Sequence, residues 1–222
     1  MWPRHPGIPG LDVLCSSTRP QNQGNERGEA MADYRRFFVP GGTYFFTLVA
    51  YRRRPRFARP LDIERLREAV AFVQREQPFQ FLAAVVLPDH MHFIWTLPPG
   101  DCDYSRRIGR MKVHFTRSCA ETERSPAEPS PSRRKHRDSD VWQRRFWEHV
   151  IDEPGALEAL LDYIHYNPVK HGNAACPHAW AASSFSRWVA LGLYDRSWGC
   201  CCERHRIMPR DFGKIEATVG EP

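Results

Sequence analysis

The feature that most constrains the fold is a short turn between two apolar segments rich in β-branched and aromatic residues. Residues 79–87 form the first segment, residues 90–97 form the second, and the tetrad Leu87-Pro88-Asp89-His90 joins them. Segments of this kind on either side of a turn predict a β-hairpin. The chain is therefore expected to contain antiparallel strands.

A third strand and three helices are predicted around this hairpin. Residues 43–51 (TYFFTLVAY) follow a Gly41-Gly42 turn and have the composition of a buried strand. Apolar residues recur every three or four positions over 61–77 and 104–122. A further helix is expected to be capped by Asp152 and to close at Pro168.

Length and composition favour one main domain that acts on a polyanion. The chain has 222 residues, 41% of them hydrophobic, and a formal net charge of +6, which favours nucleic acid as a partner. We expect an extension without stable structure at 1–30, a main domain at 31–198 with a low-complexity insertion at 125–140, and a tail at 199–222. No apolar stretch is long enough to span a membrane and no secretory signal is evident, so a cytoplasmic protein is expected.

Two histidines in the second hairpin strand are candidate metal ligands. Side chains alternate across a strand, so His90 and His92 share one face and can together hold a divalent ion. A His-x-His pair is also common in half-exposed strands that bind nothing. The motif alone therefore does not establish a metal site.

The last predicted helix carries a candidate nucleophile. Tyr163 and Asn167 are four residues apart and lie on one helix face, which places a phenol beside an amide that can ligate a metal. Tyr166 is the rival nucleophile, but it cannot share the face of Asn167 in this way. Tyr163 is equally compatible with an ordinary amphipathic helix.

Basic residues and cysteines supply the remaining candidates. Phosphate contacts are predicted for Arg106, Arg107, Arg110, Lys112, Lys170 and His171. The seven cysteines do not form a secreted disulfide framework, so reduced thiols are expected. A zinc site built from Cys176, His178, the cysteines at 200–202 and His205 is disfavoured, because the Cys-x-x-Cys spacing typical of such sites is missing.

The order of these motifs resembles that of the REP-associated tyrosine transposases, which belong to the HUH single-tyrosine (IS200-like) superfamily. The likeness runs over 34–198 and rests chiefly on LPDHMHF and YIHYNPVKHG, with QRRFWEHVI and WAASSFSRW in the expected places. LPDHMHF and YIHYNPVKHG together are far more specific for this family than either motif alone.

The resemblance implies an α+β fold, an antiparallel sheet with helices packed on one face as in ferredoxin-like RNA-recognition domains. It assigns the catalytic tyrosine to Tyr163, the histidine pair to His90 and His92, and the third metal ligand to Asn167, with Mg²⁺ or Mn²⁺ as the ion. It also implies single-stranded DNA hairpins of repetitive extragenic palindromes as the partner, and favours a monomer over a dimer. Two alternatives stay open: a catalytically silent hairpin-binding regulator, and a phosphodiesterase in which water attacks.

Overall fold

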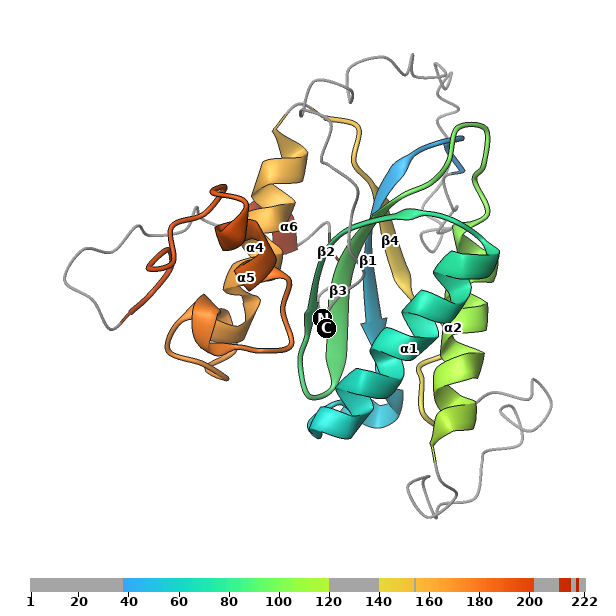
Figure 1. Cartoon of the computed structure of the whole chain (residues 1–222), viewed down its shortest axis with the longest axis horizontal. Coiled ribbons are helices and arrows are strands. Elements are labelled where there is room, and N and C mark those ends of the chain that lie inside the picture. The colour runs from blue at the N-terminus through green and yellow to red at the C-terminus, as the bar shows by residue number, and fades with distance from the viewer. Residues whose placement is uncertain (1–37, 120–139, 154, 202–211, 217–218, 220–222) are drawn as a thin grey trace, which may run out of the picture.

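The centre of the molecule is a four-stranded antiparallel sheet (Figure 1). The computed structural model describes residues 38–119, 140–153, 155–201, 212–216 and 219. The strands are β1 (Thr43–Val49), β2 (Gln80–Val86), β3 (His90–Thr96) and β4 (Trp147–Val150), in the order β2-β3-β1-β4. The predicted hairpin and the third strand are confirmed, and β4 is an edge strand that sequence patterns did not indicate.

Helices cover both faces of this sheet. Helices α1 (Pro60–Glu76) and α2 (Tyr104–Ser118) pack on one face, and α4 (Ala156–Lys170) with the short α5 (Phe185–Ala190) lies on the other (Figure 1). Smaller elements are the 3-10 turns η2 (Tyr51–Arg53) and η4 (Pro177–Ala179), and α6 (Gly213–Glu216). The expected α+β architecture is confirmed, whereas the expectation of helices on one face is corrected.

Both faces need cover because both are apolar. Along β3, Phe93 points into the core beneath α1 and α2, while Ile94 points into a second core beneath α4. On the neighbouring strand, Phe46 and Phe45 alternate in the same way. A sheet that is apolar on both sides is stable only when each side is buried. His90 and His92 lie two and four positions before Ile94, so their side chains share its face of β3 and lie under α4.

The ends of α4 differ from the prediction. The helix begins at Ala156, and its N-cap is Gly155, which has a φ of +76°. Asp152 therefore does not cap it. It continues through Pro168 to Lys170, and the expectation that Pro168 closes it is wrong. A proline lacks only one backbone N–H and its φ suits a helix. Pro168 therefore continues the helical backbone without donating a hydrogen bond to the carbonyl oxygen of Ile164, and Asn167 stays within the helix.

The predicted Gly41-Gly42 turn precedes β1. Gly41 has a φ of +69°, and a Cβ at Gly42 would lie 2.9 Å from the carbonyl oxygen of Val39. Both positions therefore require glycine. Residues 1–30, and all of the predicted 125–140 insertion except Asp140, lie outside the described residues. No helix in the described part of the chain is long and apolar enough to cross a membrane.

Candidate active site

The site is built on β3, the strand that holds the two histidines. His90 pairs with Val49 and His92 with Thr47 on β1, while Val85 of β2 faces His92 from the other side. Both imidazoles are buried, with exposed fractions of 2% and 0%, and their ring centroids lie 5.1 Å apart. The predicted pairing of the two side chains on one face is thus present in the structure.

His90 is oriented by the acidic residue that precedes it. Its Nδ1 lies 2.6 Å from Oδ1 of Asp89, and Nε of Arg53 lies 3.0 Å from the other carboxylate oxygen. Arg53 reaches Asp89 from a backbone φ of +50°, a region that residues other than glycine rarely adopt. Because a carboxylate only accepts hydrogen bonds, Nδ1 of His90 carries the proton and Nε2 presents its lone pair.

A hydroxyl fixes the tautomer of His92. Its Nδ1 lies 2.9 Å from Oγ1 of Thr47, and that hydroxyl donates its one proton to the carbonyl oxygen of Val219, 2.6 Å away. The hydroxyl oxygen must then accept a hydrogen bond from Nδ1 of His92. Nε2 of His92 is left with the lone pair, so both histidines offer the same ring nitrogen to a common ligand.

Tyr163 and Asn167 come from α4, and the Tyr163 ring faces His92. The Tyr163 ring is completely buried, with its centroid 5.4 Å from that of His92 and 6.1 Å from that of Phe45. Asn167 is equally buried, one helical turn further on. Tyr166 instead packs against Trp198, with ring centroids 6.2 Å apart. The contacts of the two tyrosines therefore favour Tyr163 over Tyr166 as the residue of this site.

The residues gathered here fit a divalent ion. Nε2 of His90 and both polar atoms of the Asn167 amide are buried without a hydrogen-bond partner among the described residues. Buried polar groups are normally paired, and orphaned ones indicate a missing ion or water. Burial lowers the pKa of His90, against the opposing effect of Asp89, and keeps its imidazole neutral as ligation requires. Two imidazoles and an amide oxygen suit a first-row divalent metal.

A segment from near the C-terminus covers the tyrosine. The Phe212 ring packs edge-on to Tyr163 at 5.6 Å, and Val219 is fully buried beside Thr47. Lys170 lies over the Tyr163 ring, 5.1 Å from its centroid, and forms a 2.7 Å ion pair with Glu216. The phenol is therefore shielded from solvent by the part of the chain that had been expected to be only a tail.

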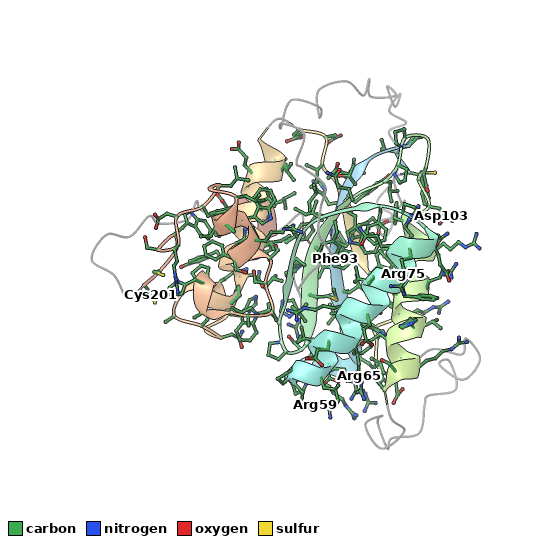
Figure 2. The ribbon with its side chains drawn as sticks, in the orientation of Figure 1. Arg59, Arg65, Arg75, Phe93, Asp103 and Cys201 are labelled. Carbon is green, nitrogen blue, oxygen red and sulfur yellow. The ribbon has the colours of Figure 1, made fainter. Side chains whose placement is uncertain are left out.

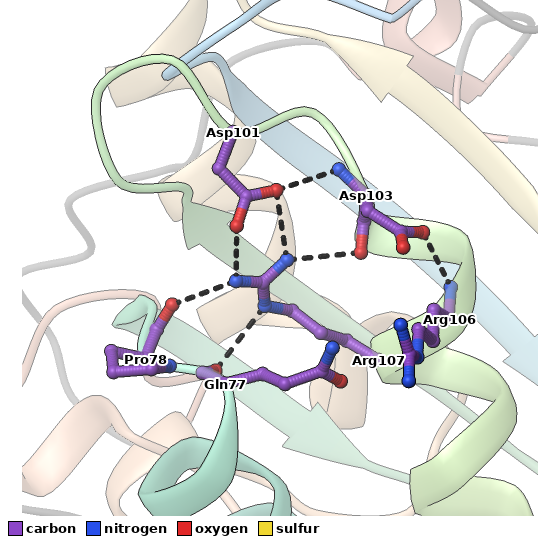
Figure 3. Close-up of polar contacts among 6 residues, drawn as sticks. All are labelled: Gln77, Pro78, Asp101, Asp103, Arg106 and Arg107. Carbon is purple, nitrogen blue, oxygen red and sulfur yellow. Dashed lines mark hydrogen bonds and ion pairs between the residues drawn. The ribbon is translucent and has the colours of Figure 1, made fainter.

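Arg107 does not act as predicted. Its guanidinium is buried, donates to both carboxylate oxygens of Asp101 and also bonds the carbonyl oxygens of Gln77, Pro78 and Asp103 (Figure 3). It ties the start of α2 to the end of α1, and it lowers the pKa of the Asp101 carboxyl. Because its donors are used within the protein, the prediction of a phosphate contact is corrected for this residue.

The other basic residues divide between the two sides of the sheet. Arg106 is exposed on α2, Arg110 pairs with Glu76, and Lys112 donates to the carbonyl oxygen of Gln143. Since α2 lies across the sheet from α4, none of these three shares a face with Tyr163 (Figure 1). Lys170 and His171 do: Lys170 covers the tyrosine ring, and the exposed His171 lies 5.2 Å from His90 between ring centroids.

Sequence reasoning missed the residues that orient the histidines. Asp89 could have been found, because it directly precedes His90 in the turn and a carboxylate commonly orients a ligating histidine. Thr47 could not, since its role depends on the register between β1 and β3. The covering role of Phe212 and Val219 likewise depends on contacts between distant parts of the chain.

The chain is similar to several known proteins. A family model described as "Transposase IS200 like" matches residues 39–167. A REP-associated tyrosine transposase of Escherichia coli K12 is 40% identical over 168 residues, covering 76% of this chain and 91% of that one. A Haemophilus influenzae protein assigned the same name is 41% identical over 169 residues, covering 76% and 94%. A solved structure, described as a REP-associated tyrosine transposase bound to a REP hairpin, is similar with a TM-score of 0.64 and 38% identity, covering 79% of this chain and 95% of that one.

Proposed function

The chain belongs to the IS200-like transposase family, among the REP-associated tyrosine transposases, and we propose that it cuts and joins single-stranded DNA beside hairpins of repetitive extragenic palindromes. The observation that carries this proposal is the contact of the buried Tyr163 ring with His92, with the buried Asn167 one helical turn further along α4. A relative bound to a REP hairpin supports the choice of substrate. The net charge of +6 suits a polyanionic partner.

In the proposed reaction, the Tyr163 oxygen attacks the scissile phosphorus. The bond from phosphorus to the 3′-oxygen breaks, a 5′-phosphotyrosine forms, and the released 3′-hydroxyl gains a proton to balance the one lost by the phenol. The polarity follows from the family resemblance. Because the phosphodiester is exchanged rather than hydrolysed, a second 3′-hydroxyl can reverse the step and join strands without ATP.

The chain's own residues supply a divalent site beside this tyrosine. His90 Nε2, His92 Nε2 and Asn167 Oδ1 are the proposed ligands, and Mg²⁺ or Mn²⁺ the proposed ion. When bound, such an ion would neutralise the charge that develops on the phosphate and lower the barrier to in-line attack. Asp89 and Thr47 hold the two imidazoles in the tautomer that ligation needs.

All of the proposed site residues belong to one chain. Tyr163 packs against His92 of the same molecule, so exchange of tyrosine helices between two copies is not needed. This supports action by a monomer. Since Tyr163 is fully buried, the segment that carries Phe212 must move before a phosphodiester can reach the phenol.

A trapping experiment tests the proposal. The protein is incubated with Mn²⁺ or Mg²⁺ and a labelled hairpin carrying single-stranded flanks, and products are separated under denaturing conditions. We expect a covalent protein–DNA adduct with wild-type protein and with Tyr166→Phe, and none with Tyr163→Phe. The phenylalanine keeps the ring and its packing, so the folded state and hairpin binding should survive.

The alternatives give different results. A catalytically silent regulator would bind the hairpin without cleaving it. A phosphodiesterase that uses water would cleave without leaving an adduct. An adduct that survives in Tyr163→Phe, or disappears in Tyr166→Phe alone, would show that the nucleophile is assigned wrongly.

A further inference from the structure

We propose that Cys176, His178 and Cys200 form a zinc site that is separate from the catalytic centre. Their ligand atoms all lie within 4.8 Å of one another, and no other group of three such residues in the described part of the chain meets the same criterion. The neighbouring Cys201 marks this place at the edge of the molecule, away from Phe93 at the centre of the sheet (Figure 2). The proposed function assigns no role to these side chains.

Two segments are held together by backbone contacts at this place. The 195–200 turn is closed by hydrogen bonds from Trp198 N to Asp195 O and from Cys200 N to Ser197 O, at 3.1 and 3.0 Å. The amide of Cys201 then donates to the carbonyl oxygen of Ala175 at 3.2 Å, directly beside Cys176. These backbone hydrogen bonds therefore hold Cys200 close to Cys176 and His178.

The distances between the donor atoms suit a tetrahedral ion. Sγ of Cys200 lies 3.3 Å from Nδ1 of His178. Zinc bonds of about 2.3 Å to sulfur and about 2.0–2.1 Å to nitrogen, at a tetrahedral angle, place these two atoms about 3.5 Å apart. Nδ1 of His178 also faces the carbonyl oxygen of Arg196 at 3.2 Å, and it would exchange that contact for the metal. Neither Cys176 nor Cys200 is in a disulfide.

The donor set selects zinc over the ions expected at the catalytic centre. Two thiolates are soft ligands that favour Zn²⁺ over Mg²⁺ and Mn²⁺, whereas the ligands proposed for the catalytic ion are two imidazoles and an amide oxygen. His178 is exposed, so a water molecule would supply the fourth ligand. The sequence disfavoured zinc because the third ligand is 22 positions beyond His178 and no Cys-x-x-Cys unit marks it. Cys202 and His205 lie outside the described residues.

The ion would stabilise the packing of the 195–200 turn and η4 against α4, the helix that carries Tyr163. Trp198, in the turn that carries Cys200, packs edge-on to Tyr166 of α4. A Cβ at Gly199 would lie 3.1 Å from that same ring and 3.2 Å from Pro177, so the turn, η4 and α4 meet closely. Linking Cys176 and His178 to Cys200 would fix this packing. We therefore expect an effect of zinc on stability and not on the chemistry of Tyr163.

The test measures metal content and stability in the untagged full chain, purified under reducing conditions and incubated with Zn²⁺ before gel filtration. We expect about one tightly held zinc per chain in the wild type. His178→Ala, at an exposed position that should not disturb folding, and Cys200→Ser should each lose it. Cys119→Ser removes a buried thiol from the opposite core and serves as the matched control, which should keep its zinc.

Two further measurements give readouts that do not depend on cleavage. Cobalt in place of zinc should give a thiolate-to-metal charge-transfer absorption that is lost in Cys200→Ser. A chelator should lower the melting temperature of the wild type and of Cys119→Ser but not of His178→Ala. His92→Ala should keep its zinc, which separates this ion from the one at the catalytic centre. Wild-type protein without bound zinc, or His178→Ala and Cys200→Ser variants that each hold as much zinc as the wild type, would overturn the proposal.

Discussion

Oδ1 of Asp89 lies 2.6 Å from Nδ1 of His90, so a residue of the hairpin turn sets the orientation of the first histidine in the strand. Asp89 is itself held by Arg53 of η2. The position of the turn residue Asp89 therefore decides which nitrogen of the His90 ring is available to bind a metal. A substitution of Asp89 should therefore weaken binding of the proposed catalytic ion without changing any of its ligands.

Asp89→Ala should weaken the binding of Mn²⁺ about 10- to 100-fold, the usual effect of losing a partner that orients a ligating histidine. The measurement is the Mn²⁺ concentration that gives half-maximal hairpin cleavage, with calorimetric Mn²⁺ titration beside it. Glu64→Ala removes an exposed carboxylate from α1, across the sheet, and should leave both values unchanged. An unchanged Mn²⁺ affinity in Asp89→Ala would count against metal binding through His90.

Phe212→Ala should increase the rate of hairpin cleavage, because the Phe212 ring packs against Tyr163 and shields it from solvent, whereas Val219 keeps its contact with Thr47. Glu216→Gln weakens the same segment more gently, by removing the ion pair with Lys170, and should act in the same direction by a smaller amount. Circular dichroism and thermal melting establish that the variants are folded. A folded Phe212→Ala variant that cleaves at the wild-type rate would show that this segment does not limit access to Tyr163.

Arg107→Met should destabilise the fold by about 3 kcal/mol, since it leaves Asp101 and several carbonyl groups without their buried donor. Arg106→Met, the exposed neighbour, should change stability by no more than about 0.5 kcal/mol. Urea denaturation of both variants measures the difference. In hairpin-binding assays the order should reverse, with Arg106→Met weakening salt-dependent binding and folded Arg107→Met retaining it. Equal losses of stability would contradict the structural role given to Arg107.

His165 should make stability dependent on pH below neutrality. Burial, with a smaller contribution from the charge of Arg187, lowers the pKa of this imidazole to about 3, and its Nε2 lies 3.0 Å from the hydroxyl of Ser184. The unfolded chain binds a proton there near pH 6.5 and the folded chain does not. Stability is therefore lost as the pH falls from about 6.5 towards 3, by about 2 kcal/mol at pH 5.

Denaturation at pH 7 and pH 5 checks this contribution. His165→Gln keeps a hydrogen-bonding side chain but cannot take up the proton, so its loss of stability between the two pH values should be about 2 kcal/mol smaller than that of the wild type. If His165→Gln shows the full wild-type loss, the imidazole is not the group that titrates.

Periodicity predicted those parts of the site that depend on one element alone. His90 with His92, and Tyr163 with Asn167, share faces because two positions along a strand and four along a helix repeat the side-chain direction. The charge of Arg107 predicts a phosphate contact, but this residue lies three positions after the buried Tyr104 and four before the buried Met111. Its position on the inward face of α2 was the available signal.

Features that depend on pairing between distant segments could not be read from the sequence. The contact of Thr47 with His92 spans 45 positions, and its second contact, with Val219, spans 172. Strand β4 is four residues long and has no distinctive pattern of its own. Helices lie on both faces because Phe45 and Phe46 point to opposite sides of the sheet. Since every residue of β1 is buried, the sequence of this strand shows no apolar–polar alternation from which two covered faces could be predicted.

The location of β3 inside the sheet has a consequence for how an ion would bind. Strand β3 is hydrogen-bonded to β2 on one side and to β1 on the other, so the backbone of both histidines is immobilised when the sheet forms. The entropy of ordering the two imidazoles is therefore lost during folding and not during metal binding. Affinity should then reflect mainly the exchange of water for nitrogen around the ion, and the metal-free and metal-bound proteins should have nearly the same backbone.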